Sequence, residues 1–158
     1  MSTVVLRPWP WDAARALLAG RPVRANDWHE EYPTPDTVDA LAMVLAAYEV
    51  DGPLTGAPPW WVFQVRDAGQ VVGDAGFHGP PAADGPVEVE IGYGVVPAVR
   101  GRGIATAACG QLLELAWHLG ADTVLAGADA DNLASRRVLQ RAGFGERPDG
   151  MFTIGRPG

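Results

Sequence analysis

The sequence has little of what marks secreted and membrane proteins. A single cysteine, Cys109, stands among 158 residues, which excludes an internal disulfide framework and makes the cytoplasm the default compartment. No apolar run approaches the roughly 18 residues of a membrane-spanning helix, and the longest candidate covers only residues 41–48. Residues 1–7 lack the basic and apolar blocks of a secretion signal. We therefore predict a cytoplasmic protein without a membrane partner.

Positive charge is also scarce. Twelve Lys and Arg residues oppose 19 Asp and Glu residues, for a net charge of −7 at pH 7. A nucleic-acid-binding domain usually has a basic surplus, so we predict no nucleic-acid partner. The cations are clustered at Arg100 and Arg102 and again at Arg136, Arg137 and Arg141. A local cluster of cations suits an anionic cofactor, and an otherwise acidic surface suits a cationic amine. The general acidity is equally explained by a contribution to solubility.

The length and patterning predict one α+β domain over residues 1–158, in three layers. The expected order is β-α-α-β-β-β-α-β-α-β-β. We expect a first helix capped by Asp12 and a second opened by Thr34 and Pro35, with Val38, Leu41, Ala42 and Leu45 on its apolar stripe. His29, His78 and His118 lack metal-ligand spacing, so no metal site is predicted. Strands are predicted at 3–7, 60–66, 71–78, 87–95, 122–128, 144–147 and 151–154, and helices at 12–18, 35–49, 103–119 and 132–142.

One stretch, Val87 to Thr106, carries the most specific signal. Apolar residues alternate with Glu and Gly over 87–95, as in a strand with two unlike faces, and Pro97 ends it. The turn Arg-Gly-Arg-Gly-Ile-Ala at 100–105 follows, in which two glycines let the backbone point its N–H groups at one place. The next helix begins with unpaired amides at the positive end of its dipole. This arrangement predicts an anion site, such as one for a diphosphate.

Two other phosphate-binding motifs fit this stretch less well. A dinucleotide-binding fold needs glycine or alanine at the third position of its motif, where Thr106 stands. Its parallel strands are buried on both faces, whereas Glu88 and Glu90 alternate through the strand here. The Gly-Lys-Ser/Thr of a Walker loop is absent from the sequence.

The turn resembles the acetyl-CoA loop of the GNAT superfamily of N-acyltransferases, Arg/Gln-x-x-Gly-x-Gly/Ala, through Arg100, Gly103 and Ala105. The segments E-I-G-Y at 90–93 and D-N-L-A-S-R-R-V-L-Q-R-A-G-F at 131–144 are similar to the ribosomal-protein-alanine N-acetyltransferase branch. The resemblance implies the GNAT fold, with a mixed central sheet splayed between the strand before the loop and the strand after the following helix. It implies acetyl-CoA as cosubstrate and direct transfer to a primary amine, either the α-amine of a protein N-terminus or a small-molecule amine.

The resemblance also assigns cofactor contacts. The backbone at Val95 and Val96 would bind the pantetheine arm, and an amide there would stabilise the oxyanion. The alternative is that neither Asn132 nor Ser135 contacts the cofactor. Asn132 would then be only a helix cap, and Ser135 an ordinary helix residue. The expected cofactor-binding residues are Val95, Val96, Arg100, Gly101, Arg102, Gly103, Ile104, Ala105, Thr106, Asn132, Ser135 and Arg137.

The catalytic assignment is Glu90 as base, with Ser135 as the candidate acid. An α-amine with a pKa of about 7.7–8 needs little more than a carboxylate that holds a water. Many family members carry an acidic tyrosine on the last helix, where this chain has Leu139. That leaves Ser135, water or no acid, since a thiolate with a pKa near about 8.5 leaves readily. The missing tyrosine also leaves open a non-catalytic CoA-binding sensor or scaffold.

Acceptor contacts are expected in the loop at residues 24–33, which lies where the family forms its acceptor wall. Trp28, Glu30, Glu31 and Tyr32 would line that wall, with Glu88 from the strand. The alternatives are a packed surface loop and, for Glu88 as for Glu90, a solvated carboxylate. A homodimer is compatible with the sequence.

Overall fold

The computed structural model describes residues 3–49 and 54–158, and every predicted strand and helix is present there, with ends shifted by one or two residues. A 3₁₀ turn at Pro97–Val99 follows the fourth strand. The elements in chain order are β1 (Val5–Pro8), α1 (Trp11–Leu18), α2 (Pro35–Tyr48), β2 (Val62–Asp67), β3 (Gln70–Phe77), β4 (Glu88–Val95), α3 (Ile104–His118), β5 (Thr123–Ala126), α4 (Leu133–Arg141), β6 (Gly145–Glu146) and β7 (Phe152–Gly155).

The strands form one mixed sheet in the order β1-β2-β3-β4-β5-β7-β6. Every neighbouring pair is antiparallel except β4 and β5, which are parallel. The parallel pair is joined through α3, as the strand-helix-strand pattern predicts. The predicted meander of β2, β3 and β4 is confirmed, and its first hairpin turns at Ala68 and Gly69, both with positive φ.

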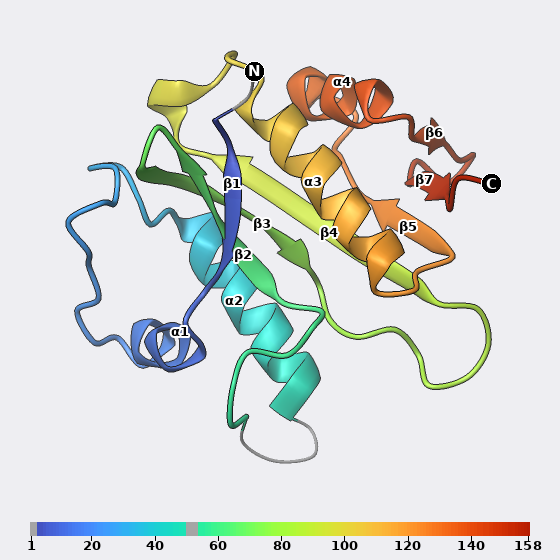
Figure 1. The fold of residues 1–158 in the computed structure, drawn as a ribbon. Helices are drawn as coiled ribbons and strands as arrows, with labels where there is room; N and C mark the ends of the chain where they lie inside the picture. The colour runs from blue at the N-terminus through green and yellow to red at the C-terminus, as the bar shows by residue number, and fades with distance from the viewer. Residues whose placement is uncertain (1–2, 50–53) are drawn as a thin grey trace.

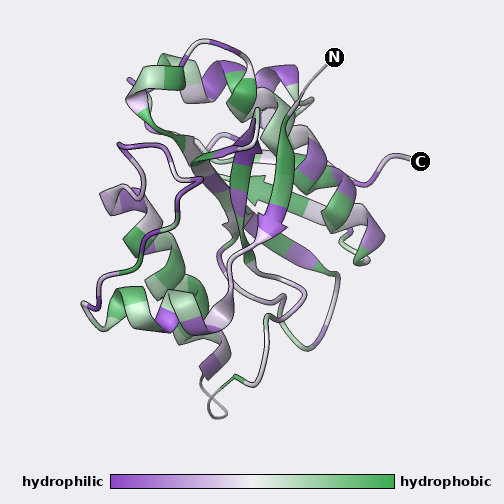
Figure 2. Ribbon diagram, turned by 60° about the vertical axis from the view of Figure 1, so that its left-hand side comes forward, coloured by the Kyte–Doolittle hydropathy of each residue, from purple (hydrophilic) through white to green (hydrophobic). Residues whose placement is uncertain are grey.

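Helices cover both faces of the sheet, α1 and α2 on one face and α3 and α4 on the other (Figure 1). In Figure 2 both the strands and the helices alternate between hydrophobic and hydrophilic segments. The predicted three-layer α+β architecture is therefore confirmed. Among residues 3–49 and 54–158, no helix combines the length and apolar character that a membrane crossing requires.

The second helix begins as predicted but buries a different stripe. The Thr34 hydroxyl accepts a hydrogen bond from the Thr37 amide, and the Thr37 hydroxyl accepts one from the Thr34 amide. Toward the sheet, α2 buries Thr37, Leu41, Val44 and Leu45, whereas the predicted Val38 and Ala42 are exposed. The helix is rotated because Thr37 hydrogen-bonds to a carboxylate in the core, which a search for apolar residues alone does not detect.

The first helix starts one residue earlier than predicted. Pro10 occupies the N-cap position, so the prediction that Asp12 caps this helix was wrong. Asp12 lies in the first turn, where its carboxylate accepts a hydrogen bond from the Ala13 amide. A carboxylate there still interacts favourably with the helix dipole.

A buried carboxylate, Asp74 of β3, ties several segments together. Its Oδ1 accepts hydrogen bonds from the Trp9 indole at 2.9 Å and the Tyr32 hydroxyl at 2.5 Å, and its Oδ2 accepts one from the Thr37 hydroxyl at 2.6 Å. Burial raises the pKa of Asp74, while these three donors act in the opposite direction. The network fixes α2 and the loop before it on the sheet.

Removing one of these donors should destabilise the fold. Thr37→Val keeps the shape of the side chain but leaves Asp74 Oδ2 without this donor and the Thr34 amide without its acceptor, so we expect a loss of about 2 kcal/mol in the free energy of unfolding. Urea denaturation measures the loss. The matched control is Thr153→Val, on partly exposed β7, which should change stability by less than about 0.5 kcal/mol. Equal effects of the two variants would contradict the importance of the network.

Candidate functional site

The sheet opens between its two parallel strands. Strand β5 pairs with β4 only from Glu88 to Ile91 and ends at Ala126. Strand β4 continues to Val95 while still paired with β3 on its other edge. The segment from Gly92 to Val95 therefore has one edge beyond the ladder with β5. This is the splay that the family resemblance implies.

Backbone groups of alternate residues face this opening. The Val96 amide donates to the Val72 carbonyl at 2.8 Å, and the Glu90 carbonyl accepts from the His78 amide at 2.9 Å, so these even-numbered residues bond toward β3. By the alternation of an antiparallel ladder, Tyr93 and Val95 direct their amides and carbonyls toward the opening. The Val95 carbonyl accepts a hydrogen bond from Arg100 Nε at 3.2 Å, which leaves the Val95 amide directed at the slot.

The assignment of Val96 as a cofactor contact needs correction. Its amide is taken by Val72, its carbonyl accepts the Val99 amide at 3.2 Å, and its side chain is fully buried. Val96 therefore offers no free backbone group to a ligand arm. The sequence showed where the strand ends but not which of its last residues points outward.

The glycine turn has the conformation that the sequence predicts. Gly101 and Gly103 both have φ of 80°, in the left-handed region that glycine adopts without strain. Gly103 is the N-cap of α3, and the first intrahelical bond of the turn runs from the Ala107 amide to its carbonyl at 3.0 Å. The amides at 104–106 thus have no intrahelical acceptor and lie at the positive end of the helix dipole.

A cavity of about 550 Å³ lies between this turn and α4. The side chain of Asn132 caps α4 by accepting the Ser135 amide at 3.1 Å, so its predicted capping role is confirmed. Arg102 is exposed and lies outside the cavity lining. The predicted cofactor residues that do line the cavity are Val95, Arg100, Gly101, Gly103, Ile104, Ala105, Thr106, Asn132, Ser135 and Arg137.

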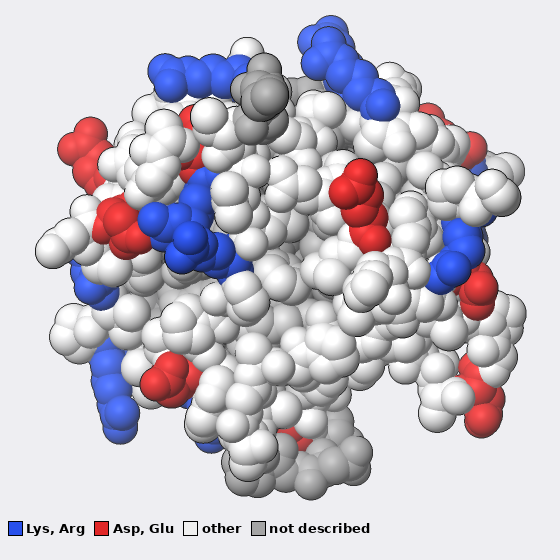
Figure 3. Space-filling view, viewed as in Figure 1, with Lys and Arg blue, Asp and Glu red and all other residues white. Residues whose placement is uncertain are grey.

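The cavity is cationic. Arg100, Arg137 and Arg141 line it. The neighbouring Arg136 instead donates to Glu146 at 2.7 Å and lies over the Phe152 ring, 5.2 Å from its centroid. Cationic side chains stand at the upper edge of the space-filling view, where the turn before α3 and helix α4 lie in Figure 1, and much of the remaining face is uncharged (Figure 3).

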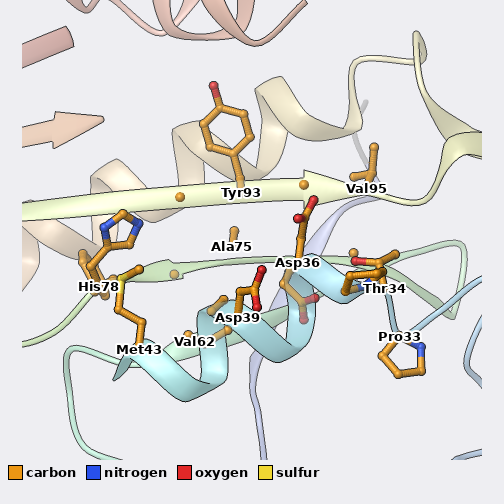
Figure 4. A pocket seen from close by; sticks show the side chains of 18 of the residues that line it. Pro33, Thr34, Asp36, Asp39, Met43, Val62, Ala75, His78, Tyr93 and Val95 are labelled. Atoms are coloured by element: carbon orange, nitrogen blue, oxygen red, sulfur yellow. The ribbon is translucent and has the colours of Figure 1, made fainter. Parts of the chain in front are cut away.

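A second cavity of about 630 Å³ lies on the other face of the sheet, between α2 and strands β3 and β4. Figure 4 shows Asp36, Asp39 and Met43 on the α2 wall, with His78 at one end of the cavity and Val95 near the other. Glycines of β3 and β4 contribute part of the lining, including Gly92 and Gly94. This face of the opening is therefore roomy and lined by carboxylates.

The two cavities meet at the opening in the sheet. Both are lined by Asp36, Tyr93, Gly94, Val95 and Arg100. A side-chain carbon built on Gly94 would have no atom within 4 Å, so the space over this residue is open. A ligand that lies along α4 and the turn can present its end to the second cavity at this point.

Tyr93 stands at this junction and was missed in the sequence. Its side chain points away from α2 (Figure 4), and its hydroxyl is 3.1 Å from both Oγ and the carbonyl oxygen of Ser135. Burial raises the pKa of Tyr93 to about 12, so the phenol stays protonated at neutral pH. Leu139, where many relatives have a tyrosine, is fully buried. One signal in the sequence could have found it. Side chains alternate between the two faces of a strand, so Tyr93 lies on the face of the sheet opposite to that of Glu90.

The predicted base, Glu90, lies on the α2 side of the sheet. Its Oε2 is 2.9 Å from Nδ1 of His78. His78 lines the second cavity, whereas Glu90 is not part of that lining. Glu88 is exposed at the far end of β4, roughly 20 Å along the strand from Val95, and lines neither cavity.

The predicted acceptor loop is packed rather than open. Trp28 and Tyr32 are 7% and 1% exposed, and their rings meet edge to face with centroids 5.1 Å apart. Glu30 is exposed outside the cavity, and Glu31, at the rim, accepts the Ala98 amide at 3.0 Å. The expectation of an acceptor wall formed by Trp28, Glu30 and Tyr32 is corrected, because two of these side chains are buried and the third is turned outward. The carboxylates of Asp36 and Asp39, which the sequence analysis missed, line the second cavity.

The structure also bears on the reactivity of Cys109 and on metal binding. Cys109 is fully buried on α3, and burial raises the pKa of its thiol to about 12, which disfavours a nucleophilic thiolate. Within the part of the chain that the structure describes, no group of three or more His, Cys, Asp or Glu residues is arranged to hold a metal ion.

Comparison with known proteins gives a family match. The model described as the acetyltransferase (GNAT) domain matches residues 3–145. An uncharacterized N-acetyltransferase of Bacillus subtilis (strain 168), YjdG, is 32% identical over 87 residues. That alignment covers 53% of this chain and 49% of the relative, so it spans about half the length of the curated protein.

Solved acetyltransferase structures share the fold. Mycobacterium smegmatis RimJ in complex with CoA-disulfide has a TM-score of 0.65 at 23% identity, over 96% of this chain and 81% of that one. The ribosomal-protein-S5-alanine acetyltransferase of Vibrio fischeri has a TM-score of 0.64 at 15% identity, over 99% and 97%. Salmonella typhimurium yncA with acetyl-CoA has a TM-score of 0.60 at 20% identity, over 97% and 94%.

Alanine should have opposite effects on stability at Gly103, in the left-handed turn before α3, and at Gly110, inside that helix. Gly103→Ala should lower the free energy of unfolding by about 1 kcal/mol, because a side chain disfavours positive φ. Gly110 lies inside α3, where an added side-chain carbon would meet no other atom within 4 Å, so Gly110→Ala should raise stability by about 0.8 kcal/mol. Denaturant unfolding measures both, and a neutral Gly103→Ala would contradict the conformation of the turn.

Proposed function

Since this chain belongs to the GNAT acetyltransferase family, we propose that it transfers the acetyl group of acetyl-CoA directly to a primary amine. The observation that carries this proposal is the pair of cavities on opposite faces of the sheet, which share their lining at the open segment of β4. One is cationic and amide-rich, and the other is lined by carboxylates. Two reactants of opposite charge can thus meet without competing for one cavity.

The first cavity suits coenzyme A. Its diphosphate would bind the free amides at 104–106 and the guanidinium of Arg137. The pantetheine arm would follow the open edge of β4, with the Val95 amide as donor, and contact Asn132 and Ser135 on α4. When bound, acetyl-CoA supplies an activated thioester. The chain's own contribution is to hold that thioester at the opening beside Gly94.

The second cavity suits an amine. Glu31, Asp36, Asp39 and Asp74 line it, against one cation, Arg100. This excess of carboxylates attracts an ammonium group. The α-amine of a peptide, with a pKa of about 7.7–8, is neutral in roughly one molecule in ten at pH 7, whereas an alkylamine of pKa about 10.4 is neutral in only about one in 2,500. We therefore propose a protein N-terminus or a small-molecule amine as acceptor. An α-amine is favoured because removing its proton at neutral pH costs less free energy.

The reaction forms the N–C bond and breaks the C–S bond. An amide such as that of Val95 would stabilise the oxyanion, a role worth of order 3–4 kcal/mol. The hydroxyls of Ser135 and Tyr93, 3.1 Å apart, lie on the cofactor side and would donate to the departing sulfur. Glu90, on the acceptor side and in contact with His78, would assist removal of the amine proton. Each group is on the face where its reactant would lie.

The decisive test is a titration followed by turnover. Calorimetry measures the binding of acetyl-CoA. Turnover is then measured with a panel of acceptors, a peptide N-terminus, free amino acids, a polyamine and an aminoglycoside. A thiol assay follows the release of CoA, and mass spectrometry detects the acetylated product. Acetylation of any amine supports the proposal. Absence of binding at sub-millimolar acetyl-CoA would overturn it. Tight binding without turnover on the whole panel would favour a sensor, the alternative that Leu139 raises by standing where the resemblance places a tyrosine.

Two adjacent arginines should differ in their effect on cofactor affinity. Arg137→Gln removes a cation from the cofactor cavity, so we expect at least about a tenfold rise in the dissociation constant for CoA, or 1.4 kcal/mol. Arg136→Gln is the matched control, because Arg136 is paired with Glu146. Calorimetry at two salt concentrations measures both, with the affinity of the parent protein falling as salt rises. Equal losses would contradict the assignment of Arg137.

A further inference from the structure

The backbone pairs His78 with Glu90. His78 directly follows β3, and its amide donates a hydrogen bond of 2.9 Å to the carbonyl of Glu90 on the neighbouring strand β4. Their side chains share the face that α2 covers, and Nδ1 of His78 is 2.9 Å from Oε2 of Glu90. This contact places the Nδ1 proton toward the carboxylate and leaves Nε2 as the acceptor in the neutral imidazole.

A glycine makes room for the imidazole. A side-chain carbon built on Gly92 would lie 3.0 Å from Nε2 of His78, so the free nitrogen stands over this residue of β4. Gly94 follows on the same face, about 7 Å further along the strand, and has open space above it. Nε2 therefore lies one residue pair from the junction of the two cavities, so an amine nitrogen held between these two points is within reach of Nε2 directly or through one bound water.

The imidazole of His78, and not the carboxylate of Glu90, lines the acceptor cavity. The His78 side chain is 33% exposed, and the Glu90 side chain, which is 40% exposed, contacts the ring from outside that lining. In Figure 4 the His78 ring lies near Met43 of α2, with Asp39 one turn earlier on that helix. The charged side chains that line this space with His78 are those of Glu31, Asp36, Asp39, Asp74 and Arg100, and Glu90 contacts the ring.

We propose that His78, rather than Glu90, receives the proton of the attacking amine, and that Glu90 is a positioning residue that holds the ring. This inference rests on the proposed acetyl transfer and names its base. As the amine nitrogen forms the N–C bond, its ammonium proton passes to Nε2 of His78, directly or through one water. The C–S bond then breaks with its electron pair on sulfur. The imidazolium returns its proton to solvent, from which the thiolate is protonated.

The test compares His78→Gln with Glu90→Gln, with His118→Gln as the matched control at the exposed end of α3. His78→Gln should lower kcat by roughly 100-fold, with acetyl-CoA affinity and melting temperature retained, and the control should match the parent. Glu90→Gln should lower kcat less than His78→Gln does. Glu90→Asp should keep more activity than Glu90→Gln, because it retains a carboxylate on the side of Nδ1 of His78.

Rescue provides the second readout. His78→Ala opens space over Gly92, and added imidazole should restore a substantial part of its lost activity without affecting the parent protein. The inference is overturned if His78→Gln keeps at least half of the parental kcat. It is also overturned if Glu90→Gln loses as much activity as His78→Gln, which would make Glu90 the base. In either case acetyl transfer by the parent protein still supports the proposed function.

Discussion

The early end of β5 is the constraint on which the site depends. Because β5 pairs with only the first half of β4, the second half keeps its support from β3 but has one edge free. A closed ladder would separate the two faces of the sheet completely. The free edge, at Tyr93 and Val95, both supplies hydrogen-bonding groups and lets two cavities on opposite faces reach the same point.

A second constraint keeps the acceptor side in place. The wall of that cavity is α2, which carries Asp36 and Asp39, and α2 is held to the sheet by the hydrogen bond from Thr37 to Asp74. The same carboxylate binds Tyr32 and Trp9, so the loop predicted as an acceptor wall is instead part of the support for α2. Burying this carboxylate costs desolvation energy, which its three donors offset.

Much of this could be predicted from the chain. The glycines at 101 and 103 and the cap at Asn132 were predictable because one local conformation requires those residue types. The outward direction of Val95 rather than Val96, and the approach of Asp36, His78 and Tyr93 to one opening, depend on register and on helix rotation, which pairs of distant segments set. The cytoplasmic location and the homodimer stay predictions.

The charges of the two cavities explain why the sheet must lie between them. If the arginines of α4 and the carboxylates of α2 faced each other across one cavity, they would neutralise one another and attract neither reactant. The sheet separates them except at the opening, where Arg100 and Asp36 line both cavities. The glycines at 92 and 94 suit this place for a related reason. One leaves room for the His78 ring and the other leaves the junction open, so a bulky side chain at either position would narrow the passage that unites the two halves of the site.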